Sequence, residues 1–148
     1  MATRHMLSVV LSVVVALMLS TTALAEIGQI KTMTGEVTLI RNNVKSTPQP
    51  GDLLDQHDII ETGKDGSLGI TFIDGSRFSA GPSTRLELSQ FQFNPTTHEG
   101  KFVTDIKSGS LSVISGKIAK HDKEAMKIKT PTTILGVRGT EFLVKVER

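Results

Sequence analysis

"SLGITFIDG", residues 67–75, is the stretch that decides the fold class. Apolar residues alternate with small or polar ones from Leu68 to Phe72, so the apolar set shares one face of an extended strand. Asp74-Gly75 follows the strand and Asp65-Gly66 precedes it. Asp-Gly pairs favour type I′ hairpin turns, because both central positions need positive φ. The stretch therefore predicts a strand with one buried face, bracketed by two turns.

The same alternation recurs along the chain in short runs, separated by Gly, Pro, Asn and Asp. The runs are EVTLIR, TRLELSQF, KFVTDI, SLSVI, MKIK and EFLVKV. They predict an all-β fold, a single domain of many short strands. A rolled or solenoid-like sheet, a small barrel and a sandwich all fit the pattern. The phenylalanines are expected in the core: Phe72, Phe78, Phe102, Phe142, Phe91 and Phe93. For Phe91 and Phe93 an exposed partner-binding edge is the alternative.

Residues 117–127, "KIAKHDKEAMK", break the alternation. We interpret this charged segment as a solvated loop between strands, while a helical turn or a long exposed hairpin also fits. A contact site for an acidic partner or for anionic lipid headgroups is a further alternative.

The first 25 residues have the pattern of a secretory signal peptide. Arg4 precedes fourteen mostly apolar residues, Met6 to Leu19, and Ala23-Leu24-Ala25 supplies a small-residue cleavage site. As a helix the apolar run would span roughly 21 Å, short of the ~30 Å hydrocarbon core, which argues against a retained membrane anchor. We expect cleavage after Ala25, a mature domain of residues 26–148 and a periplasmic location.

Composition and motifs give little support for catalysis, and we expect no enzyme activity, cofactor or metal. The chain has no cysteine, and no nucleotide-binding or nucleophile-elbow motif occurs. His57, His98 and His121 lie in charged or turn-rich stretches, and metal sites need three or four ligands. Trp and Tyr, the usual sugar-binding platforms, are absent. Without Arg4 the chain carries 16 basic and 15 acidic residues of mixed order, so we expect no nucleic-acid partner.

"KIKTPTTILGVRGTEFLVKV", residues 127–146, places an arginine in an apolar run. Thr130-Pro131 should begin an extended segment, because the residue before proline favours β conformation. Gly136 and Gly139 flank Val137-Arg138, and two glycines this close suggest a bulge, a tight corner or a close backbone approach. Arg138 at that bend would bind carbonyls or a carboxylate and hold the last strand to the domain. A binding site or a catalytic electrophile is the alternative.

These motifs, taken together, resemble the FecR-type domain of bacterial envelope proteins. The resemblance runs through GQIKTMTGEVTLIR, PGDLLDQHDIIETGKDGSLGITFIDGSRFSAGPSTRLEL, KSGSLSVISGK and IKTPTTILGVRGTEFLV. It implies a periplasmic all-β module and a structural role for the family-motif residues Asp74, Gly75, Thr130, Pro131, Gly136, Val137, Arg138, Gly139 and Thr140. The best-known members of the family are inner-membrane regulators that relay a signal from an outer-membrane receptor to a cytoplasmic sigma factor. We expect this protein to differ from them in lacking a sigma-binding region before its apolar segment and a further domain after Arg148.

We therefore expect a non-catalytic periplasmic interaction module in envelope sensing or signal relay. Its partners would be envelope proteins, met through an exposed strand edge that accepts a further strand. The alternative is a structural or glycan-associated protein of the cell envelope.

Overall fold

The computed structural model describes residues 25–137 and 141–147. Most of this backbone is β-strand, which confirms the expected all-β class. One short helix, α2 (Lys117–His121), is present. The strands are β1 (Gly28–Thr34), β2 (Val37–Arg41), β3 (Val44–Ser46), β4 (Leu53–Leu54), β5 (Ile59–Thr62), β6 (Ser67–Phe72), β7 (Arg77–Ala80), β8 (Arg85–Phe93), β9 (Gly100–Ile114), β10 (Met126–Lys129), β11 (Ile134–Gly136) and β12 (Glu141–Val146). No helix in these ranges is long and apolar enough to cross a membrane.

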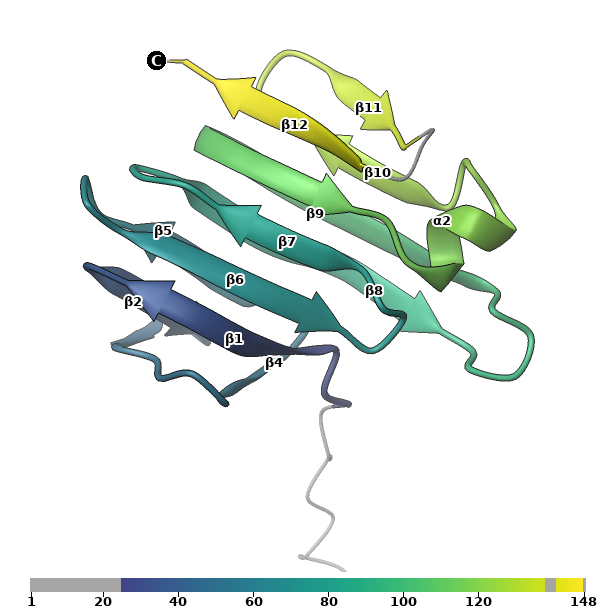
Figure 1. The fold of residues 1–148 in the computed structure, drawn as a ribbon, viewed down its shortest axis with the longest axis horizontal. Coiled ribbons are helices and arrows are strands. Elements are labelled where there is room, and N and C mark those ends of the chain that lie inside the picture. The colour runs from purple at the N-terminus through teal and green to yellow at the C-terminus, as the bar shows by residue number, and fades with distance from the viewer. Residues whose placement is uncertain (1–24, 138–140, 148) are drawn as a thin grey trace, which may run out of the picture.

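The long strand β9 belongs to both layers of a rolled sheet (Figure 1). Its residues 100–108 pair with β8 and its residues 111–114 pair with β7. One layer has the order β12-β9-β7-β6-β1-β4, and the other has the order β3-β2-β5-β8-β9-β10-β11. All these pairings are antiparallel except that of β10 with β9, which is parallel. The architecture is therefore a rolled sheet, one of the expected alternatives.

The bend of β9 lies at Gly109, whose φ is 88°. A Cβ atom on this residue would lie 2.2 Å from Thr84 Oγ1, so there is no room for a side chain. The Thr84 hydroxyl accepts a hydrogen bond from Ser110 N–H at 3.0 Å and lies 3.1 Å from the Ser110 carbonyl, to which it donates. Positive φ and close contact together explain why glycine occupies the bend.

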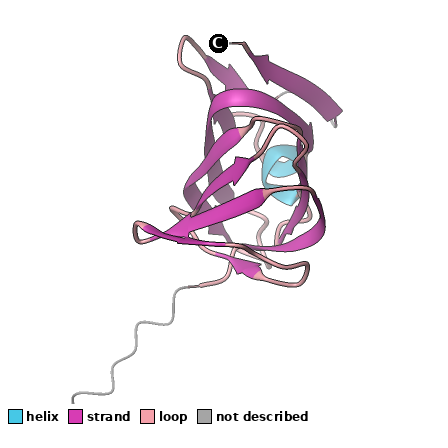
Figure 2. Ribbon diagram, turned by 90° about the vertical axis from the view of Figure 1, so that its left-hand side faces the viewer, coloured by secondary structure: helices cyan, strands magenta, loops and turns pink. Residues whose placement is uncertain are grey.

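The core lies between the two layers (Figure 2) and is built by the alternating apolar residues. Leu68, Ile70 and Phe72 are each only 2% exposed, as the opening stretch predicts. The Phe72 ring meets Phe78 and Phe102 edge to face, with centroids 4.8 and 4.6 Å apart. Of the remaining phenylalanines, Phe91 is buried, and Phe93 and Phe142 are partly buried against the same core.

The turns differ from the expected type I′ hairpins at both Asp-Gly pairs. Only Gly75 of the Asp74-Gly75 pair has positive φ, and Phe72 N–H bonds to Ser76 O, which closes a three-residue loop. Asp65-Gly66 does not join neighbouring strands at all, because it links β5 in one layer to β6 in the other. The two-residue turn with positive φ at both positions is Asn42-Asn43, between β2 and β3.

The segment 117–127 is not a solvated loop throughout, and that interpretation is corrected by the structure. Its start forms helix α2, in which Ile118 is 0% exposed and Ala119 is buried. Figure 2 shows the helix at the side of the rolled sheet, between its layers. Ile118 and Ala119 form the apolar face of this single helical turn and close the core. Burial of these two side chains favours the helix although most of the segment is charged.

Candidate interaction surface

The Thr130-Pro131 pair forms a turn and does not begin a strand. Strand β10 ends at Lys129, Thr130 N–H bonds to Thr133 O at 2.8 Å, and Thr133 N–H bonds to Thr130 Oγ1 at 3.1 Å. The expectation of an extended segment is therefore wrong here. The threonine hydroxyl stabilises a chain reversal that lets β11 pair antiparallel with β10.

The glycine corner expected after β11 is only partly described. Among the described residues, the atom nearest to a Cβ added at Gly136 is Glu124 Oε2, at 3.8 Å. The φ of Gly136 is not positive, and no described residue makes the close backbone approach that was one of the three expected alternatives. Val137 is buried and its N–H bonds to Met126 O at 3.1 Å. Arg138, Gly139 and Thr140 lie outside the described residues, and their roles stay predictions.

The Asp74-Gly75 turn attaches helix α2 to the sheet. The fully buried Asp74 carboxylate accepts hydrogen bonds from the N–H and the hydroxyl of Ser76, at 3.0 and 2.8 Å. Ser76 Oγ in turn accepts the Gly116 N–H at 2.9 Å, and Lys117 N–H bonds to the Asp74 carbonyl at 2.8 Å. The turn thus satisfies backbone donors at the start of the helix, which is a structural role.

Sequence reasoning missed the ion-pair cluster of Arg41, Asp55 and Asp58. The Arg41 guanidinium contacts Asp58 at 2.7 and 2.8 Å and Asp55 at 3.0 Å, and it donates to the Leu53 carbonyl. The hydrogen bond to Asp58 raises the pKa of Arg41 above its usual value, against the opposing effect of burial. The two aspartates therefore hold a cationic side chain of the protein. No local sequence pattern predicts this cluster, because Arg41 lies on strand β2, 17 positions before Asp58.

The histidines do not form a chemical site with these carboxylates. His57 has positive φ in a turn and its ring lies 3.1 Å from Gln56 Nε2, while His98 stacks on Phe93 with centroids 6.3 Å apart. In the part of the chain that the structure describes, no three His, Cys, Asp or Glu side chains are grouped so that they could hold a metal ion.

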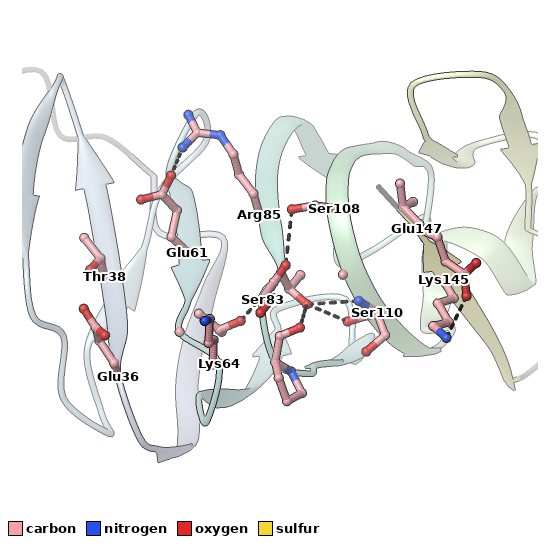
Figure 3. A pocket seen from close by; sticks show the side chains of 16 residues that line it. Glu36, Thr38, Glu61, Lys64, Ser83, Arg85, Ser108, Ser110, Lys145 and Glu147 are labelled. Atoms are coloured by element: carbon pink, nitrogen blue, oxygen red, sulfur yellow. Dashed lines mark hydrogen bonds and ion pairs between the residues drawn. The ribbon is translucent and has the colours of Figure 1, made fainter.

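An open groove of about 910 Å³ runs across the corners where the chain passes between the layers (Figure 3). Its polar groups are largely engaged with each other: Arg85 pairs with Glu61, the Ser108 hydroxyl donates to the Ser83 carbonyl at 3.2 Å, and Lys145 pairs with Glu147 at 2.9 Å. The first contact joins strands β5 and β8, the second joins two corners, and the third lies within the C-terminal segment, so most of these groups have partners within the fold.

Three exposed apolar side chains lie on the last two strands, which are at one end of the sheet (Figure 1). Ile134 and Leu135 on β11 are 62% and 37% exposed, and Leu143 on β12 is 70% exposed. A second groove, of about 430 Å³, lies between the Thr130–Thr133 turn and β12 and is lined in part by Pro131, Leu135 and Leu143. We call this region, with Pro131, Ile134, Leu135 and Leu143, the C-terminal edge surface.

Both strands of the C-terminal edge surface are terminal strands of the described sheet. β11 pairs only with β10, and β12 pairs only with β9. Unpaired backbone N–H and C=O groups on such edges can accept a further strand, and clustered exposed apolar side chains mark contact sites. Among the surfaces described here, this region has the features of a protein-binding edge.

Comparison with known protein families finds a match to the family described as FecR protein, over residues 58–148. The match covers more than half of the chain and confirms the resemblance carried by the sequence motifs. It includes β5 to β12 and the whole C-terminal edge surface. No match was found among curated proteins or among solved structures.

Proposed function

We propose, from the premise that the chain belongs to the FecR protein family, that it is a non-catalytic interaction module that takes part in signal relay in the bacterial cell envelope. FecR domains are associated with regulators that relay signals at the envelope, and the family is regulatory in character. The proposal extends this general association to a specific surface of this chain.

The observation that carries the proposal is that both apolar side chains of strand β11, Ile134 and Leu135, are exposed. Ile134 is 62% exposed on a strand that has a free edge, beside the groove lined by Pro131 and Leu135. A partner segment in extended conformation would gain backbone hydrogen bonds from the edge and apolar contacts from these side chains. Specificity would come from the side chains, because the backbone hydrogen bonds are common to all sequences.

The location that we propose is the periplasm, where FecR domains typically lie. Export would remove the first 25 residues, so the processed protein would begin at Glu26. Cell fractionation followed by intact-mass measurement tests this step by itself. A processed mass starting at Glu26 in the periplasmic fraction supports it, and an unprocessed chain held in the membrane contradicts it.

The partner surface is tested by placing a photo-crosslinking amino acid at position 134 in the living bacterium. We expect crosslinks to one or a few envelope proteins, identified by mass spectrometry. Ile134→Lys and Leu135→Lys should each abolish capture of that same protein by the purified domain. Val44→Lys is the matched control, because Val44 is 67% exposed but lies on β3, a different terminal strand. Equal loss of capture in the control would argue against a specific edge.

Crosslinking at position 134, combined with sedimentation of the protein with purified peptidoglycan, separates the proposed role from that of a glycan-associated protein. A chain that sediments with purified peptidoglycan, and whose position 134 crosslinks to no protein, would replace the proposal with the glycan role. Binding to a protein that is lost in the two β11 variants and retained in the β3 variant supports the relay module.

A further inference from the structure

Strand β12 is the longest free edge of the described sheet. The four terminal strands are β3, β4, β11 and β12, and they contain 3, 2, 3 and 6 residues. Proteins usually shorten, charge or cover such edges to prevent unwanted pairing. β12 is long, and the centre of its outer face is Leu143, which is 70% exposed. An edge of this kind is suited to pairing with another strand.

The outer face of β12 is complementary to itself. Glu141, Leu143 and Lys145 are exposed on this face, while Val144 is buried and Phe142 is partly buried on the inner face. An acidic and a basic residue thus lie at equal distances on either side of a leucine. If a second β12 is placed antiparallel with Leu143 opposite Leu143, Glu141 of each copy lies opposite Lys145 of the other.

We propose that two copies of this chain associate edge to edge through β12, in an antiparallel pair centred on Leu143, so that one layer of the rolled sheet continues from one copy into the next. The occupant of this edge is a second copy because the charge pattern is satisfied by the identical strand reversed. Each Lys145 already contacts Glu147 at 2.9 Å within its own chain, and Glu141 of the second copy would be an additional acidic neighbour.

The backbone is compatible with this register. Successive residues of a strand point their N–H and C=O groups alternately to the two sides. In the proposed register Leu143 faces Leu143 of the second copy, and every other residue from Glu141 to Lys145 faces one that is two or four positions away in sequence. Paired residues therefore direct their backbone groups to the same side, either both toward or both away from their own β9. The groups directed away from β9 in one copy therefore meet those directed away from β9 in the other. Phe142 also comes opposite Val144 on the inner face, which joins the apolar faces of the two copies.

Neighbouring registers lose these matches. A shift by one residue would place backbone groups that point away from β9 in one copy opposite groups that point toward β9 in the other. It would also put the apolar face of one strand on the solvent side of its partner. A two-fold centre at Phe142 or Val144 would place one of the charged residues opposite Leu143 and leave the charge pairing unmade. The centre at Leu143 is the register that satisfies both the backbone and the side chains. The pairing uses the edge of β12, whereas the partner contact proposed above is centred on Ile134 and Leu135 of β11. Leu143 borders both, because it lines the same groove as Leu135.

A cysteine at the centre of the pair tests the contact directly. The chain has no cysteine, so Leu143→Cys introduces a single thiol. Directly opposite residues in an antiparallel pair have Cα atoms about 4.5–5.5 Å apart, within the range that a disulfide spans. We expect the protein purified after expression of the complete chain to form a disulfide-linked dimer on mild oxidation. Val44→Cys, equally exposed on β3, should stay mostly monomeric under the same conditions. Equal crosslinking of the two variants would overturn the proposal.

Charge exchange tests the register. By sedimentation equilibrium, Glu141→Lys and Lys145→Glu should each weaken self-association by about tenfold, because each puts like charges opposite one another twice. The double variant Glu141→Lys/Lys145→Glu should recover most of the wild-type affinity. An equimolar mixture of the two single variants should form mixed dimers in preference to either homodimer. A wild-type protein that stays monomeric at millimolar concentration, or a double variant as weak as the single ones, would disprove the pairing.

Discussion

Asp58 receives two hydrogen bonds from the guanidinium of Arg41, at 2.8 Å from Nε and 2.7 Å from a terminal nitrogen, while its own side chain is only 1% exposed. The carboxylate also accepts the Asp55 N–H at 2.8 Å. A buried carboxylate with a fork of two donors is well compensated as long as the arginine is present. The pair ties strand β2 to the turn that precedes β5.

Replacing Arg41 should therefore leave a buried negative charge without its partner. We expect Arg41→Gln to lower the free energy of unfolding by about 2–3 kcal/mol, somewhat less than for a fully buried pair, because water reaches one side of the arginine. Urea unfolding measures the change. Lys45→Ala is the control, since the exposed Lys45–Glu61 contact at 3.9 Å should contribute within about 0.5 kcal/mol. Equal effects of the two changes would contradict this account of the cluster.

The bend of β9 predicts a difference between two glycines of similar backbone conformation. Gly75 has φ of 84° with open space around it, and Gly109 has φ of 88° with Thr84 in the way of any side chain. Gly75→Ala should cost about 1–2 kcal/mol of stability from its backbone alone. Gly109→Ala should cost about 1–3 kcal/mol more because of overpacking. Urea unfolding of the two variants side by side checks this, and equal losses would show that contact with Thr84 is unimportant.

The buried hydroxyl of Ser76 predicts a local as well as a global effect. It donates to Asp74 and accepts from Gly116 N–H, so Ser76→Ala leaves two buried polar groups with fewer partners. We expect a loss of about 2–3 kcal/mol in the free energy of unfolding. Limited proteolysis should also cut residues 117–125 faster than in the wild type. Ser79→Ala, at an exposed position on the neighbouring strand, should change neither measurement.

Asp105 predicts a contribution to stability that depends on pH. Burial raises the pKa of its carboxyl, but hydrogen bonds from Ser89 Oγ at 2.5 Å and Lys107 Nζ at 3.1 Å outweigh burial, so its folded-state pKa is lowered. A lowered folded-state pKa means that the ionised form stabilises the fold above the unfolded pKa of about 3.9, and that this contribution is lost as pH falls through the folded value.

The difference in unfolding free energy between wild type and Asp105→Asn should consequently be constant near neutral pH and shrink below about pH 4. Urea titrations from pH 3 to pH 7 measure it. A difference that does not change over this range would show that ionisation of Asp105 has no part in the effect.

The strands of this protein could be predicted from the sequence because strand alternation is a local property. Leu68, Ile70 and Phe72 are buried as their spacing indicates, and the family motifs were sufficient to identify the FecR relationship. Turn types were predicted less well. Asp74 uses its carboxylate to bind Ser76, and Thr130 uses its hydroxyl to close a turn, so side-chain hydrogen bonds changed the local outcome.

The sequence by itself determined that this chain would form short strands with one apolar face, because the alternation of apolar and polar residues depends only on neighbouring positions. Only the tertiary structure decided which strands end the sheet, where β9 bends and which arginine meets Asp58. These outcomes join residues far apart in the chain, such as Thr84 with Gly109 and Arg41 with Asp58. Their energies come from packing and charge pairing across space, which no short stretch of residues contains.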